Sequence, residues 1–173
     1  MRPTAENRPS NTTANHTVPA FVVTVIDGAD NQRFAPRITG TFTGTTDEIL
    51  QWGACKWGID EDLNRTIAVL ESTWYQSTLG DGGHSVGIQQ VNQLYHHCLP
   101  ACQTGTAYNV DWARAWWRSC YEGEMGWLGN TRGDALGCAE AWYSGEWRTP
   151  VGAGYLNDLV TTMASKPWLN PGW

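Results

Sequence analysis

The chain is poor in positive charge and has no long hydrophobic run. It carries 11 Lys and Arg against 17 Asp and Glu, for a formal net charge of -6. A nucleic-acid partner is therefore not expected, because binding to phosphate backbones draws on counterion release by a basic surface. No apolar run approaches the roughly eighteen residues of a membrane span, and the N-terminus lacks a signal peptide's apolar core. We therefore expect a soluble chain with no membrane insertion.

Length and composition divide the chain into three parts. A chain of 173 residues is long enough for one well-cored domain. Residues 1–20 are polar and rich in Asn, Thr and Pro, which predicts a flexible N-terminal arm. Residues 21–45 contain β-branched and alternating stretches, which predict an extended strap or short strands. Residues 46–173 are acidic overall and are expected to form the folded domain, as a monomer.

Helical patterns dominate from residue 46 onward. Thr46 can cap a first helix that ends at Gly58, and Asp60 can cap a second. The apolar face of the second follows i, i+4, i+7, i+11 spacing. The fold class is thus mainly α, of the α+β type, with a short extended or β segment at the N-terminal side. Further helices are predicted near 86–98, 110–128, 134–143 and 151–164, the last with Thr149 as its cap and Pro150 as its first residue.

The five cysteines indicate an oxidising compartment. Cys55, Cys98, Cys102, Cys120 and Cys138 in a short acidic chain fit disulfides better than a cytosolic thiol set. We therefore expect a secreted or cell-envelope protein. The spacing of Cys98 and Cys102 fits a local bridge, and Cys120 with Cys138 could tie two helices together, which would leave Cys55 free. The sequence alone does not determine this connectivity.

Histidines and aromatic residues each allow two interpretations. His84, His96 and His97 with Cys98 and Cys102 could be drawn as a zinc site, but a local disulfide fits better, and we expect no metal and no organic cofactor. The chain also has 11 Trp and six Tyr. Most of these rings are expected to pack in the core, and those at the surface offer flat faces that suit sugar rings.

Glu71 is the most informative titratable residue. It lies one helical turn from Ile67 and Ala68 on one side and from Trp74 and Tyr75 on the other, so it falls on an apolar stripe. A carboxyl group held against apolar side chains is desolvated, stays protonated near neutral pH and can donate a proton to a leaving oxygen. The alternative is a glutamate at the edge of the stripe that turns to solvent.

Two motifs extend this interpretation. Glu71-Ser72 is followed, after a Gly-rich loop, by Ser85-x-Gly87-Ile88-x-Gln90. The pair resembles the glutamate and Ser-Gly-Gln motifs of the lysozyme superfamily, most nearly its soluble lytic transglycosylase and goose-type lysozyme branch. Looser matches follow at Asn109-Val110, at 141–145 (Ala-Trp-Tyr-Ser-Gly) and at Tyr155-Leu156. The resemblance covers about residues 47–160 and implies a lysozyme-like helical bundle around a substrate groove.

The resemblance implies a role for each matched residue. Glu71 would protonate the glycosidic oxygen and then act as a base toward water or the sugar's own 6-hydroxyl. Gly87 would let the backbone approach the substrate closely. Tyr143 departs from the pattern, since the family usually has Asn there, and the Glu-Thr-Arg that usually precedes the final Tyr is absent. The expected substrate contacts are Ser72, Trp74, Tyr75, Ser85, Gly87, Gln90, Trp142, Tyr143, Trp147 and Tyr155.

A second carboxylate would decide the mechanism. Inverting and retaining glycosidases use two, whereas transglycosylases of this branch use one glutamate. Asp81, in the loop between the motifs, is the candidate, although an Asp in Asp-Gly-Gly also serves its own backbone. Glu122, Glu124, Glu140 and Glu146 are expected on solvated faces.

The expected function is cleavage of a β-1,4-linked polysaccharide, with peptidoglycan as the first substrate candidate. One alternative is a neutral polysaccharide such as chitin or glucan, because an acidic domain matches an anionic wall poorly. Another is a non-catalytic glycan-binding module, against which the intact Glu71, Ser85, Gly87 and Gln90 argue.

Overall fold

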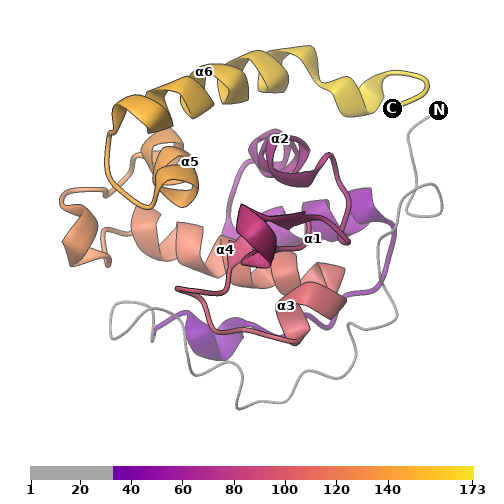
Figure 1. Cartoon of the computed structure of the whole chain (residues 1–173), viewed down its shortest axis with the longest axis horizontal. Helices are drawn as coiled ribbons and strands as arrows, with labels where there is room; N and C mark the ends of the chain where they lie inside the picture. The colour runs from indigo at the N-terminus through magenta and orange to yellow at the C-terminus, as the bar shows by residue number, and fades with distance from the viewer. Residues whose placement is uncertain (1–32) are drawn as a thin grey trace.

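Helices form most of the chain that the computed structural model describes, residues 33–173 (Figure 1). A small three-stranded antiparallel sheet lies between the second and third helices in chain order. The predicted class, mainly α of the α+β type, is confirmed. The predicted arm, residues 1–20, and the first part of the predicted strap or strands, residues 21–32, lie outside the described residues. The helices are α1 (Thr46–Trp57), α2 (Glu61–Ser72), α3 (Ala101–Thr104), α4 (Thr106–Tyr121), α5 (Ala135–Ser144) and α6 (Pro150–Ser165).

Polar caps set the starts of α1 and α2. Thr45, and not the expected Thr46, caps α1, in a capping box with Glu48. Asp60 caps α2 as predicted. Such caps each stabilise a helix by about 1 kcal/mol. Helix α2 ends where Thr73 adopts the left-handed conformation, with φ 52°.

The sheet occupies a segment for which a helix was predicted. Val86 pairs with Leu79 on one side and with Val91 on the other. The helix predicted over 86–98 is therefore wrong. Gly87 (φ 80°) and Gln90 (φ 49°) adopt left-handed conformations that a helix cannot contain, and β-branched valines suit the short strands. The strands are β1 (Leu79–Gly80), β2 (Ser85–Val86) and β3 (Val91–Asn92).

Helix α4 passes through the centre of the domain, against α1, α3 and α5 (Figure 1). All its residues except Arg118 and Tyr121 are buried. The prediction of a helix over 110–128 was too long at its end, because Gly123 turns the chain with φ 73°. A separate 3-10 turn, η7 (Gly126–Leu128), follows.

Helices α5 and α6 pack on each other, and α6 also packs across α2 (Figure 1). Both agree with the predicted helices to within one residue at each end. The Thr149 side chain accepts the Gly152 N–H at 2.9 Å, and Pro150 is the first helical residue, as predicted. The packing of α6 on α2 brings Tyr155 to the end of α2.

Residues 38–45 form an extended strap, and within the described residues they pair with no strand. A short turn, η5 (Ala35–Arg37), precedes them. The buried carboxylate of Asp111 on α4 accepts the backbone N–H groups of Thr39 and Gly40 at 2.8 and 3.0 Å. The strap interpretation is therefore the correct one for this stretch.

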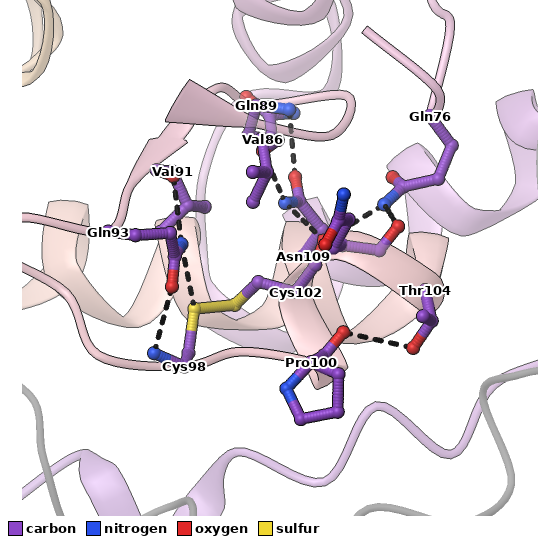
Figure 2. Close-up of a disulfide and its surroundings, with 11 residues drawn as sticks. Gln76, Val86, Gln89, Val91, Gln93, Cys98, Pro100, Cys102, Thr104 and Asn109 are labelled. Carbon is purple, nitrogen blue, oxygen red and sulfur yellow. Dashed lines mark hydrogen bonds between the residues drawn. A yellow bond between two sulfur atoms is a disulfide. The ribbon is translucent and has the colours of Figure 1, made fainter. Parts of the chain in front are cut away.

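Asn109 on α4 attaches the sheet to the helices (Figure 2). Its Oδ1 accepts the Gln89 N–H at 2.8 Å, and its Nδ2 donates to the carbonyls of Val86 and Cys102 at 2.9 and 2.8 Å. The Gln76 amide also donates to the Cys102 carbonyl, at 2.9 Å. One buried amide therefore holds both the loop after β2 and helix α3.

Two disulfides connect neighbouring elements. Cys98–Cys102 joins the segment after β3 to α3 (Figure 2), and Cys120–Cys138 joins α4 to α5. Cys55 is the free cysteine. This is the pairing that the spacing favoured, and it is compatible with an oxidising compartment. Among residues 33–173, no helix combines the length and the apolar composition that crossing a bilayer requires.

The two bridges should contribute unequally to stability. Cys120–Cys138 spans 18 residues and Cys98–Cys102 spans four, so loop-closure entropy predicts about 3 and about 2 kcal/mol respectively. Replacing each pair by serines should therefore lower the free energy of unfolding more for Cys120 and Cys138, measured by denaturant titration. Five free thiols in the native protein, detected by non-reducing mass spectrometry, would contradict the pairing.

Candidate functional site

An open cavity of about 980 Å³ lies among the end of α2, the sheet, α4 and α5. Its walls combine acidic, amide and aromatic side chains, and among the described residues no Lys or Arg lines it. This lining suits a ligand with hydroxyl groups and apolar faces better than an anion. The acidic lining residues are Glu71, Asp81 and Glu146, and the aromatic ones are Tyr95, Trp116, Trp127, Trp142 and Tyr143.

Glu71 stands in the last turn of α2, where its half-buried side chain opens on the cavity. The Tyr155 hydroxyl, brought by α6, donates to Glu71 Oε1 at 2.8 Å. Burial raises the pKa of Glu71 to about 7, against the hydrogen bond from Tyr155 and the positive charge of Arg114, which lower it, and with the nearby Asp81 charge, which raises it. The carboxyl group therefore carries a proton in a large fraction of molecules at neutral pH.

Arg114 is a buried cation beside Glu71 that the sequence did not single out. Its Nη2 donates to Gln89 Oε1 at 2.7 Å, and its Nε and Nη1 are buried without a hydrogen-bond partner among the described residues. Burial lowers the pKa of Arg114 to about 10, whereas Tyr155 and Glu71 raise it. The sequence feature that could have identified Arg114 is its charge within the apolar stretch Trp112-Ala-Arg-Ala-Trp.

Asp81 is exposed at the rim of the cavity, in the turn η6 (Asp81–Gly83). Its Oδ2 accepts the Ser85 hydroxyl and, at 3.4 Å, the Asn92 amide. Asp81 therefore holds the ends of β2 and β3 together, and its charge still reaches Glu71. Of the two predicted catalytic residues, Glu71 is the one in the protected environment.

Three motif residues build the loop beside Glu71. The Ser72 hydroxyl donates to the Ile88 carbonyl at 2.9 Å, and the Gln90 amide donates to the Gly87 carbonyl at 2.8 Å. A Cβ on Gly87 would lie 2.3 Å from Asn109 Nδ2, so the glycine is required by packing. Ser85 and Gln90 line the cavity, whereas Ser72 and Gly87 lie behind it.

The predicted aromatic contacts divide into two groups. Trp142 and Tyr143 line the cavity, and Tyr143 stacks on Tyr155 with ring centroids 4.4 Å apart. Trp74 is 1% exposed and packs against Trp168 in a second core cluster, so it presents no surface to a ligand.

Tyr75 and Trp147 also lie outside the cavity lining. Glu140, expected on a solvated face, is buried and accepts a hydrogen bond from Arg148 at 2.9 Å. That expectation is corrected: the side chain is an internal ion-pair partner. Sequence periodicity predicts the face of a helix on which a residue lies, but not which other segment covers that face. It therefore could not predict which of these residues are buried and which line the cavity.

His96 belongs to the cavity wall and not to a metal site. Its ring stacks on Trp142 with centroids 5.4 Å apart and meets Trp116 edge-on. Cys98 and Cys102, the other members of the zinc alternative, are joined in a disulfide and cannot act as thiolate ligands. Within residues 33–173, no three His, Cys, Asp or Glu residues gather as a metal site would require.

Replacing Tyr155 by Phe should raise the pKa of Glu71 above 7. The variant keeps a ring to stack on Tyr143 but loses the hydroxyl that favours the ionised carboxyl. Proton donation by Glu71 would then persist to higher pH. Infrared difference titration of the carboxyl band, with Glu71→Gln as the blank, measures this pKa without a substrate.

Two further variants test the same electrostatics. Arg114→Met should also raise the pKa of Glu71, and Asp81→Asn should lower it, because they remove a positive and a negative charge respectively. A lower pKa in Tyr155→Phe, or shifts of one sign in both charge variants, would contradict the described geometry.

Comparison of the chain with family models, with curated proteins and with solved structures gives no match. The resemblance of the two short motifs therefore stands on their residues alone. The chemistry of the cavity has to be argued from Glu71 and its surroundings.

Proposed function

We propose that the chain cleaves a β-1,4-linked glycan, with Glu71 as the general acid and base. The observation that carries the proposal is a carboxyl group with a pKa near 7, bonded to Tyr155 and opening on an aromatic-lined cavity. A general acid works best when its pKa lies near the operating pH. The Glu71-Ser72 and Ser85-x-Gly87-Ile88-x-Gln90 motifs, which resemble those of lytic transglycosylases, support the same chemistry.

The proposed reaction has two proton transfers. Protonated Glu71 donates its proton to the glycosidic oxygen as the C1–O bond breaks, and the leaving sugar departs as an alcohol. The Glu71 carboxylate then takes a proton from the nucleophile that bonds to C1. The Tyr155 hydroxyl and the charge of Arg114 favour the carboxylate in this second step, so the same residue can serve as acid and as base.

We propose that the nucleophile is the sugar's own 6-hydroxyl, which gives a 1,6-anhydro product. The alternative requires a second carboxylate to activate water or to attack C1. Asp81 is exposed and accepts hydrogen bonds from Ser85 and Asn92, which is a sufficient structural role for it. A single glutamate is therefore the simpler assignment.

Peptidoglycan is the first substrate candidate, on the motif resemblance. A neutral polysaccharide, such as chitin or a glucan, is the second, and the cavity wall favours it. The described wall contains Asp81 and Glu146 and no Lys or Arg, so it offers nothing to compensate anionic groups on a peptidoglycan strand. Export to an extracytoplasmic compartment, which the two disulfides fit, would bring either polymer within reach.

Glu71→Gln should abolish glycan cleavage while the protein stays folded. The amide has nearly the same shape but cannot donate the proton, and general acid catalysis typically contributes about 10²–10⁴ in rate. The measurement is mass spectrometry of products released from purified peptidoglycan, chitin and soluble glucans. Glu61→Gln, an exposed position on the same helix, is the matched control. Wild-type activity in Glu71→Gln would refute the assignment, and glycan binding without any cleavage by the wild type would indicate a binding module.

Asp81→Asn should cost little activity, and the wild-type products should carry a 1,6-anhydro ring. If Asp81 instead activates water, the substitution should cost orders of magnitude in rate, and the wild type should release reducing sugars of inverted configuration. Product mass separates the two cases, because the anhydro product is lighter by one water molecule. If Asp81→Asn stays active and only reducing-end products are released, both the 1,6-anhydro mechanism and water activation by Asp81 are refuted.

A further inference from the structure

Two aromatic rings of the cavity wall lack partners that the other rings have. Trp127 and Tyr95 both line the cavity, yet they are 56% and 66% exposed. Within the described part of the chain, neither ring forms an aromatic pair or a side-chain hydrogen bond, whereas Tyr143 stacks on Tyr155. A ligand that covers both rings would remove a large apolar area from water.

The turn that carries Trp127 is anchored on both sides of the ring. Met125 is 0% exposed and Leu128 is 5% exposed, and the Leu128 N–H donates to the Met125 carbonyl at 2.9 Å. The side chain between them is thus presented from a fixed backbone. A ligand binding to such a ring does not have to order a loop, which lowers the cost of association.

Trp127 and Glu71 line the same cavity from different elements, the turn η7 and helix α2. Turn η7 lies beyond the end of α4, at the left edge of Figure 1, whereas α2, which carries Glu71, lies near the centre. The cavity of about 980 Å³ is at the upper end of the range for ligand sites. It therefore has room for several sugar units in addition to the one at Glu71.

The chemistry of the cavity lining fits a sugar ring. A β-1,4-linked hexopyranose with equatorial hydroxyl groups exposes C–H groups on its faces, which pack on aromatic rings, and hydroxyl groups at its edge, which need polar partners. Asn92 and Ser144 are polar lining residues, and the described wall has no Lys or Arg to hold a phosphate or sulfate.

We propose that Trp127, together with Tyr95, forms a sugar-binding subsite that holds the glycan strand at a distance from Glu71. The inference rests on the proposed function for its ligand class, and it adds a binding site outside the two motifs that contain Glu71 and Gln90. The subsite determines how long a strand must be for tight binding, because only a strand that extends from Glu71 to η7 covers both places.

Binding is measured by calorimetry in the Glu71→Gln background, with the hexasaccharide of β-1,4-linked N-acetylglucosamine as the probe. Adding Trp127→Ala should raise the dissociation constant about tenfold, and Trp127→Phe should restore most of the affinity. Leu169→Ala, which truncates an exposed apolar side chain (49% exposed) outside the cavity, should change nothing. Tyr95→Ala should act in the same direction as Trp127→Ala, and it provides a second variant if Trp127→Ala fails to fold.

Cleavage by the otherwise wild-type protein adds the dependence on strand length. Trp127→Ala should raise KM for the hexasaccharide about tenfold and leave cleavage of the trisaccharide unchanged. Unaltered hexasaccharide binding in both Trp127→Ala and Tyr95→Ala, or no binding of the hexasaccharide at all, would overturn the subsite. Binding that depends on Trp127 in a protein that cleaves no glycan would keep the subsite and defeat the proposed function.

Discussion

The buried polar side chains of α4 are what the rest of the structure depends on. Because the helix is enclosed almost entirely, its polar side chains can be stabilised only by partners inside the protein. Asp111 is satisfied by the strap and by Trp57 Nε1 at 2.6 Å, and Asn109 by the sheet and α3. Arg114 reaches toward the cavity through Gln89. These hydrogen bonds fix the position of α4 along its axis and its rotation about that axis, which a hydrophobic core alone would fix less firmly. The cavity is built against the helix held in this way.

The pKa of Glu71 is set by opposing effects, of which burial is the largest. Burial favours the neutral acid, whereas the Tyr155 hydroxyl and the Arg114 charge favour the carboxylate, and the pKa settles near 7. If burial acted alone, the residue would hold its proton too strongly to act as a base, and if it were exposed it would lose the proton well below neutral pH. The partners come from α4 and α6, so the acid–base character of a residue on α2 depends on how three helices pack.

Two of the motif residues organise the backbone and do not line the cavity. Ser72 and Gly87 organise the backbone behind the cavity, through a hydrogen bond to Ile88 and through close packing on Asn109. Trp142 and Tyr143 supply surface to a ligand.

Local sequence patterns determined the mainly α class, most helix boundaries and the apolar stripe around Glu71, because caps and periodicity act within a few residues. Cysteine spacing favoured the observed disulfide pairing but did not determine it. They failed where conformation or burial depends on distant segments. The segment after β2 forms strands because left-handed residues and Asn109 hold it there, and Trp74 is covered by Trp168 from the end of the chain. Local patterns could not give the partners of Glu71 either: Tyr155, which only the motif resemblance assigned to the site, lies 84 residues away in the sequence. Tertiary packing, which removes water from between helices, brings that hydroxyl to the carboxyl group.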